Sequence, residues 1–266
     1  MKLIFLVYAC LLALFVKGQN NQTIKLTDSI DLSYINYHIT QFDLLNEASP
    51  VVLIPQGLFL PKEKLWFYRV PDSSMRIRNF SISHDDTSVF FIAKKEGKQY
   101  LLQIHKTASS VQEVKNLLEL DNAWYMTYPA GTGQLWLTRQ KSSFRVFRIN
   151  NSIPGLLTEK AAITGIFAAD TSGVLLNYGN HVNFLRLNGT EDTLFHSPLV
   201  IKQVSLTESG VFIISTAAGV FYFLKGLTPE LLNDKIPDGV IKIAGHNVWV
   251  LSDAEKKIYK YTMAEQ

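Results

Sequence analysis

Apolar and polar positions alternate along this chain in short runs that recur at a nearly constant spacing. Five clusters of turn-forming residues, rich in Gly, Asp, Ser and Asn, each precede a short apolar run. These runs are "VFFI" at 89–92, "LWL" at 135–137, "VLL" at 174–176, "VFII" at 211–214 and "VWVL" at 248–251. Successive runs lie about 40 residues apart, and a fixed period of that length is typical of repeat architectures.

A second apolar run follows each of the first ones after a short polar or glycine-containing gap. The second runs are "QYLLQI" (99–104), "FRVFRI" (144–149), "HVNFLRL" (181–187), "GVFYFL" (219–224) and "KIYKY" (257–261). A sixth copy lies upstream, in "VVLIPQGLFLPKEKLWFYRV". Such runs, rich in β-branched and aromatic residues and joined by turns, predict β-hairpins. The apolar stretch 210–224 is therefore predicted to be two strands and not a membrane span.

Six copies of the repeat predict an all-β fold. Each copy has room for one strand before and one after its hairpin, which gives four-stranded blades and, by radial closure, a six-bladed β-propeller. The last copy ends after its third strand, so residues 23–42 are predicted to supply the fourth strand and close the ring. A β-sandwich or two smaller β domains are the alternatives. Segments 111–120 and 228–235 have helical spacing, but their place in the repeat favours outer strands or connectors.

The N-terminus has a different pattern from the rest of the chain. Lys2 is followed by the apolar run "LIFLVYACLLALFV", then by Lys17 and Gly18. A cationic start, an apolar run and a small residue at the exit predict a secretory signal peptide, residues 1–18. A membrane anchor is the alternative, but an apolar run of about 14 residues is short for a span. We therefore expect a secreted protein whose mature part, residues 19–266, is a single domain without a membrane span.

Charge and cysteine content exclude several function classes for the mature chain. The formal net charge is +3, and Lys2 and Lys17 leave with the predicted signal peptide. A nearly neutral chain lacks the clustered basic face that nucleic-acid binding requires. The only cysteine, Cys10, leaves as well, so neither a disulfide nor cysteine chemistry is expected. Four Asn-x-Ser/Thr triplets predict N-glycosylation in that compartment, at Asn21, Asn79, Asn150 and Asn188.

The usual catalytic signatures are missing from this sequence. It contains no GxSxG elbow, no HExxH pair and no P-loop. His84, Asp85 and Asp86 fall on the repeated turn, where Asp serves backbone geometry. Four further histidines have no spacing that would bring two of them to one metal ion: His105, His181, His196 and His246. No catalytic residue and no cofactor is therefore predicted.

A ligand of a propeller is expected at one mouth of its central channel, among strand starts and hairpin loops. The repeat places these residues at the strand starts: Arg78, Asn122, Trp124, Thr164, Gln203 and Lys242. The hairpin loops add Lys94, Arg139, Tyr178, Thr216 and Asp253. This lining is aromatic and basic, which suits an aromatic or anionic organic ligand better than Ca²⁺ with its oxygen ligands. The predicted contacts are Trp124, Arg139, Tyr178 and Lys94, with Asn122 beside them.

Two short stretches resemble the regucalcin/gluconolactonase (SMP-30) and NHL-like superfamily of six-bladed propellers. "NEASPVV" (46–52) is similar to a glutamate-containing segment of that family, and "KIPDGVIKIAGHNVWVLSDAEKKIYKY" (235–261) to its Pro-Asp-Gly blade. The resemblance implies a divalent metal held by Glu47 and Asp238, with Asn122 as a third ligand, and metal-dependent lactone or ester hydrolysis. In this chain, however, the Pro-Asp-Gly lies in the last copy, and Asn122 three copies before it. The hydrolase is therefore the second hypothesis.

In overall plan the chain resembles the insect ommochrome-binding proteins. The shared features are a signal peptide, a similar length and six short blades ending in "KIYKY". This resemblance implies a secreted, non-enzymatic propeller that carries an aromatic pigment. A small organic ligand is thus the first expected partner, and an extracellular protein bound to a propeller face is the third hypothesis.

Overall fold

The described part of the chain consists of β-strands joined by turns and loops. The computed structural model describes residues 24–46, 48–71, 73–83, 88–105, 114–120, 124–127, 135–140, 144–150, 153–160, 165–168, 173–206, 211–216, 219–224, 230–233 and 236–263. Within these ranges the strands form six sheets of four strands each. No helix in these ranges is long and apolar enough to cross a membrane.

The first three sheets follow one another along the chain. The first sheet comprises β2 (Phe42–Leu45), β3 (Ser49–Ile54), β4 (Gly57–Leu60) and β5 (Leu65–Arg69). The second comprises β6 (Arg76–Ile82), β7 (Ser88–Lys95), β8 (Lys98–His105) and β9 (Val114–Leu120). The third comprises β10 (Trp124–Thr127), β11 (Leu135–Gln140), β12 (Phe144–Asn150) and β13 (Ile153–Lys160).

The last three sheets repeat this plan, with one exception. The fourth sheet comprises β14 (Gly165–Ala168), β15 (Gly173–Asn177), β16 (His181–Arg186) and β17 (Glu191–His196). The fifth comprises β18 (Ile201–Leu206), β19 (Val211–Thr216), β20 (Gly219–Leu224) and β21 (Glu230–Asn233). The sixth comprises β22 (Val240–Ala244), β23 (Asn247–Ser252), β24 (Lys257–Met263) and, as its outer strand, β1 (Ile24–Asp31).

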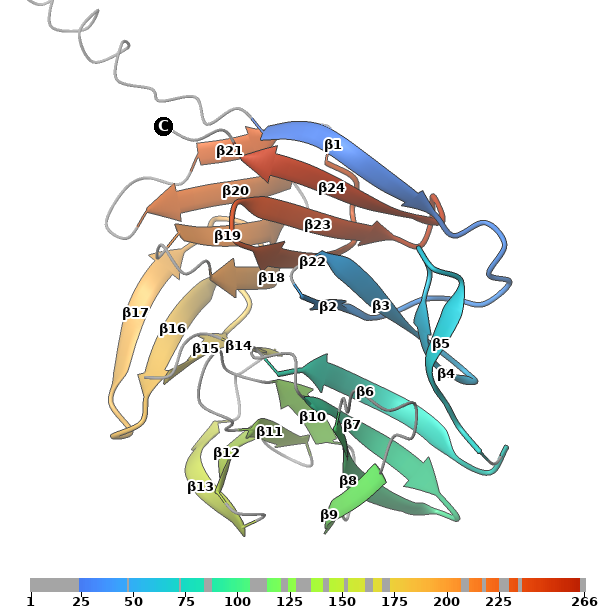
Figure 1. The fold of residues 1–266 in the computed structure, drawn as a ribbon. Coiled ribbons are helices and arrows are strands. Elements are labelled where there is room, and N and C mark those ends of the chain that lie inside the picture. Colours follow the sequence, from blue (N-terminus) through green and yellow to red (C-terminus); the bar gives the residue numbers. More distant parts are fainter. Residues whose placement is uncertain are drawn as a thin grey trace, which may run out of the picture.

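The sheets are the blades of a β-propeller, which confirms the predicted all-β propeller fold. Each sheet is an antiparallel meander, and Figure 1 shows the sheets arranged about a common centre with their first strands facing inward. Neighbouring first strands contact one another, as β2 does with both β6 and β22. The repeat length of about 40 residues is therefore the length of one four-stranded meander.

The segments whose secondary structure the sequence left open are strands. The apolar stretch 210–224 contains β19 and β20, which pair from Val211 with Leu224 to Thr216 with Gly219. The two segments with helical spacing contribute β9 and β21, each the outer strand of its sheet. Hydrogen bonding to a neighbouring strand overrides the local helical pattern at both places.

The N-terminal strand joins the two ends of the described chain. β1 pairs antiparallel with β24, from Ile24 opposite Met263 to Asp31 opposite Lys257. The chain then passes from the sixth sheet to the first through residues 32–41. Leu32, Ile39 and Phe42 are fully buried there against residues of both sheets, in one apolar cluster. Burial of a large apolar side chain contributes about 1.5–3 kcal/mol, so this segment holds the first and sixth sheets together.

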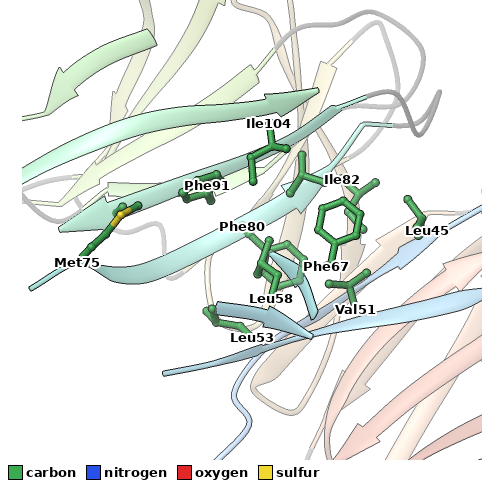
Figure 2. Close-up of a cluster of buried hydrophobic side chains, with 12 residues drawn as sticks. Leu45, Val51, Leu53, Leu58, Phe67, Met75, Phe80, Ile82, Phe91 and Ile104 are labelled. Carbon is green, nitrogen blue, oxygen red and sulfur yellow. The ribbon is translucent and has the colours of Figure 1, made fainter. Parts of the chain in front are cut away.

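Apolar side chains also fill the space between neighbouring sheets. Figure 2 shows the cluster between the first and second sheets, in which Leu58 and Phe67 face Phe80 and Phe91. Because successive side chains of a strand alternate between its two faces, each sheet contributes one apolar face to the cluster before it and one to the cluster after it. A chain with no disulfide is held together by this continuous packing.

A polar clasp reinforces the junction of the sixth sheet with the crossing segment. The Asp253 carboxylate accepts hydrogen bonds from the Ile39 amide at 2.9 Å and from Lys256 Nζ at 2.7 Å, and it contacts His38 Nδ1. Lys256 Nζ also donates to the Tyr37 carbonyl. Partial burial acts to raise the pKa of Asp253, but the bonds from Lys256, Ile39 and His38 outweigh it and lower the pKa to about 2.

Replacing Asp253 is expected to give a pH-dependent loss of stability. Asp253→Asn removes a charged acceptor, so its free energy of unfolding near neutral pH falls by about 1–2 kcal/mol. The folded pKa of about 2 lies below the ordinary 3.8, so the stabilisation is complete above about pH 4 and disappears as the pH falls toward 2. Urea unfolding of both proteins near neutral pH and near pH 2 measures this difference in stability. Asp192→Asn, which removes an exposed pair with Arg186, is the control and changes stability by less than about 1 kcal/mol. An Asp253→Asn effect that persists at low pH would contradict the clasp.

Candidate functional site

Polar side chains at or near the inner strands link the first sheet to the second and the fifth sheet to the sixth. Gln41 Oε1 accepts from Asn79 Nδ2 at 3.3 Å, and Gln41 Nε2 donates to the Phe80 carbonyl at 2.7 Å. Gln203 Oε1 accepts from the Ile241 amide at 2.7 Å between the fifth and sixth sheets. Both links connect residues about one repeat apart, because equivalent positions of successive sheets face each other around the centre.

An ion pair lies among the inner strands where the first sheet meets its two neighbours. Asp43 Oδ2 accepts from the Ile82 amide at 2.9 Å, and Asp43 Oδ1 lies 3.2 Å from Lys242 Nζ. The predicted mouth residue Lys242 is thus present at the centre, but its charge is neutralised by Asp43. It holds β2 and β22 together and is a poor candidate for charge pairing with a ligand.

The second sheet carries a cluster of cations at the start of its inner strand. Arg76 opens β6 and lies opposite Lys94 in the ladder, while Arg78 occupies a bulge between the paired residues Ile77 and Asn79. Like charges at directly opposite positions destabilise a sheet. Among the residues that the structure describes, none forms an ion pair with these three cations. A bound anion would relieve their mutual repulsion.

The third sheet has the predicted aromatic and cationic pair at the same place. Trp124 opens β10 and lies opposite Arg139, as Arg76 lies opposite Lys94 one sheet earlier. β6 and β10 are neighbouring inner strands in contact. Sequence analysis assigned Trp124 to a strand start and Arg139 to a hairpin loop, and the register brings the two backbone positions together. The predicted Asn122 lies outside the described residues.

Tyr178 makes two contacts within the protein that the sequence did not predict. Its hydroxyl donates to Glu191 Oε1 at 2.5 Å, and its ring stacks on that of His181 with centroids 4.8 Å apart. Burial and then the Glu191 carboxylate raise the pKa of Tyr178 well above its usual range. Partial burial acts to raise the pKa of Glu191, but bonds from Tyr178, Asn183 and Lys160 lower it on balance. The hydroxyl and one ring face of Tyr178 are therefore already occupied within the protein, which leaves little of it for a ligand.

Of the three residues that the resemblance implies as metal ligands, Asp238 alone lies in the described ranges. Glu47 and Asn122 lie outside the described residues. Asp238 pairs with Lys202 Nζ at 2.7 Å, and its side chain is 72% exposed. In the described ranges, no group of three or more His, Cys, Asp or Glu could hold a metal ion. The described member of the implied metal set is thus an exposed carboxylate that already pairs with an ammonium group.

A serine and a histidine are close in the second sheet, a contact that sequence analysis missed. Ser88 Oγ lies 3.0 Å from His105 Nδ1 and also accepts from Gln103 Nε2 at 3.0 Å. Ser88 opens β7 and is opposite His105, so the hairpin register contained the signal. Because Ser88 is only 4% exposed, its hydroxyl is buried beneath the exposed His105, and the contact serves the packing of the hairpin. The trio His84, Asp85 and Asp86 lies outside the described residues.

The four glycosylation triplets have different surroundings. Asn188 lies exposed in the turn between β16 and β17, and its Oδ1 accepts from the Thr190 amide and hydroxyl. Asn79 is half-buried in β6, with its Nδ2 bonded to Gln41. Asn150 ends β12, and Asn21 lies outside the described residues. Since a glycosyltransferase must reach the amide nitrogen, Asn188 is the best placed of the described acceptors.

The comparisons with known proteins show the fold and no family. No family model and no curated protein matches this chain. Among solved structures, a candidate gluconolactonase is 10% identical with a TM-score of 0.55, over 92% of this chain and 93% of that one. A PQQ-bound aldose sugar dehydrogenase from Streptomyces coelicolor is 9% identical with a TM-score of 0.58, over 91% and 98%.

Two further solved structures widen the range of functions that this fold supports. A chain of a nidogen/laminin complex is 11% identical with a TM-score of 0.57, over 80% of this chain and 83% of that one. An oligogalacturonate lyase in complex with manganese is 9% identical with a TM-score of 0.59, over 82% and 74%. Enzymes and a protein complex share the fold at such low identity, so the fold by itself assigns no activity.

Proposed function

We propose that the chain is a closed six-bladed β-propeller that is secreted and binds a small aromatic or anionic molecule without converting it. The pairing of β1 with β24 and the contacts of β2 with both β6 and β22 support closure of the ring. The apolar N-terminal run and the exposed Asn188 acceptor support secretion and glycosylation. The carrier plan of the ommochrome-binding proteins, which the layout of the chain resembles, is consistent with such a role.

The observation that carries this proposal is the charge of the second and third sheets at the starts of their inner strands. Arg76, Arg78 and Lys94 form a cation cluster without carboxylate partners in the described ranges, and Trp124 and Arg139 occupy the corresponding ladder position of the next sheet. Cations placed next to an aromatic residue suit a flat anion, since the ring stacks while the charges pair. We call Arg76, Arg78, Lys94, Trp124 and Arg139 the cationic sector.

The experiment is a fluorescence titration with anilinonaphthalene sulfonate, an aromatic anion that becomes fluorescent when it is bound. The Trp124→Ala, Arg139→Ala double variant removes one stacking surface and one charge. We expect its affinity for the dye to fall at least tenfold, which corresponds to about 1.4 kcal/mol. Circular dichroism verifies that the variant keeps the β-sheet content of the parent protein.

A second tryptophan–arginine pair provides the matched control. Arg69 lies over the ring of Trp66 at 5.6 Å, on the outer strand of the first sheet. The Trp66→Ala, Arg69→Ala variant is therefore expected to bind the dye as the parent protein does. Full affinity in the Trp124 variant, or an equal loss in the control, would contradict binding at the cationic sector.

A protein-binding role is the second candidate, because one edge of the first sheet exposes large apolar side chains. Leu65 is 60% exposed on the outer strand β5, beside exposed Trp66 and Tyr34. Tyr34 and Trp66 each pack edge-to-face against Phe59, so the patch is continuous. Exposed apolar patches of this kind often mark protein interfaces. Loss of a secreted binding partner in the Trp66 variant, with dye binding retained, would favour this role.

A further inference from the structure

Two histidines of the fourth sheet lie opposite each other on neighbouring strands. His181 opens β16 and His196 ends β17, and they are partners in the ladder. Their ring centroids are 5.2 Å apart, with the planes inclined by 29°. His196 is exposed and His181 is half-buried, so water and ions reach the pair. Sequence analysis found no spacing that would bring two histidines to one metal ion, but the strand register places these two opposite each other.

The surrounding residues hold the His181 ring in place. Tyr178 stacks on it at 4.8 Å with the planes nearly parallel, and the Tyr178 hydroxyl is fixed by Glu191. His181 Nδ1 lies 3.1 Å from Asn180 Oδ1. In the tautomer in which Nδ1 donates its proton to this amide oxygen, Nε2 carries a free lone pair. A ligating histidine usually has this arrangement, with its other ring nitrogen donating to a neighbouring oxygen.

We propose that His181 and His196 bind a divalent transition-metal ion through one nitrogen of each ring, with water completing the coordination. Imidazole suits zinc, nickel and copper. Bonds of about 2.0–2.1 Å place two ligating nitrogens within about 4 Å of each other, which small side-chain rotations achieve from the observed stack. With only two protein ligands the site is open and exchangeable. It lies in the fourth sheet and does not depend on the proposed ligand binding at the cationic sector.

The test is equilibrium dialysis of the untagged protein against copper(II) chloride, which is expected to bind such a site most tightly among these ions. His196→Gln removes an exposed ligand whose ring contacts that of His181, so the variant is expected to fold as the parent does. We expect its copper affinity to fall at least tenfold. The electron paramagnetic resonance spectrum of bound copper is expected to show coupling to two ring nitrogens in the parent protein and to lose one of them in the variant.

His246→Gln is the matched control, since it removes a histidine in the exposed turn between β22 and β23. Its copper affinity is expected to equal that of the parent. An unchanged affinity of His196→Gln, or an equal loss in His246→Gln, would overturn the proposal. His181→Gln gives an independent check, because it leaves the exposed His196 in place and is also expected to weaken binding at least tenfold.

Discussion

Leu32→Ala is expected to destabilise the protein by about 3 kcal/mol, within the range found for buried leucines. Leu32 is 0% exposed and packs in the apolar cluster that joins the crossing segment to the first and sixth sheets. Its amide also donates to the Lys256 carbonyl at 2.8 Å, so the backbone holds the side chain in place and limits collapse of the cavity. Urea unfolding followed by tryptophan fluorescence measures the loss, since Trp249 belongs to the same cluster.

Leu26→Ala is the control for this prediction. Leu26 lies on β1, shortly before Leu32 in the chain, but is 49% exposed, so its removal leaves no buried cavity and costs less than about 1 kcal/mol. Equal costs for the two leucines would mean that the N-terminal segment does not pack between the first and sixth sheets. The proposed closure of the ring would then lose its apolar support.

Gly57→Ala is expected to cost about 3 kcal/mol or more, because its backbone leaves no space for a side chain. Gly57 has φ of +142°, and a Cβ there would lie 2.1 Å from the Tyr68 carbonyl oxygen. The neighbouring strand would have to move away, which breaks the pairing of β4 with β5. The steric clash and the unfavourable φ act together, a combination that places a substitution among the most damaging ones. Thermal unfolding and amide exchange of β5 measure the effect.

Gly97→Ala distinguishes the cost of the positive φ from the cost of the steric clash. Gly97 has φ of +84° in the turn before β8, and a Cβ there would meet nothing within 4 Å. Only the backbone strain remains, about 1–2 kcal/mol. If Gly57→Ala were no more costly than Gly97→Ala, the close approach of β4 and β5 would not constrain the fold.

The repeat made most of the fold predictable from sequence. A period of about 40 residues, with two apolar runs in each copy, is enough to predict four-stranded meanders. The repeat also predicted an outer strand or connector at residues 228–235, whose helical spacing alone would have been misleading. The β-bulges of the inner strands could not be predicted from the repeat. Arg78 and Lys202 each stand outside the ladder of an inner strand, and such a shift depends on how neighbouring sheets pack rather than on the local pattern.

The candidate site was predictable only in part. The positions of Trp124, Arg139 and Lys94 followed from the register of the repeat, but the partner of Lys242 did not. Asp43 lies in another copy nearly two hundred residues earlier in the sequence, and no local pattern links the two. The histidine pair was only partly readable from sequence. Asn188 and Gly189 indicate the turn of a hairpin. A bulge between Val182 and Asn183 then sets His181 opposite His196, and the local pattern does not predict that shift.

The charges of the described residues bear on the choice between the proposed carrier and the hydrolase. A metal-dependent hydrolase needs several oxygen or imidazole ligands directed at one ion. Asp43 and Asp238, two carboxylates near the starts of inner strands, are each paired with a lysine. The cations Arg76, Arg78 and Lys94 lack such partners in the described ranges. Within these ranges the unpaired charge is therefore positive, which supports the proposed binding of an anion.

Native mass spectrometry of the protein purified from its natural source, together with its absorption spectrum, tests whether it carries a small organic molecule. For the proposed carrier we expect the mass of the chain, with any glycans, plus one small organic molecule. An absorption band beyond that of tryptophan and tyrosine is expected when this molecule is aromatic. A protein that carries no organic molecule under native conditions, with or without a metal ion, would rule the carrier out.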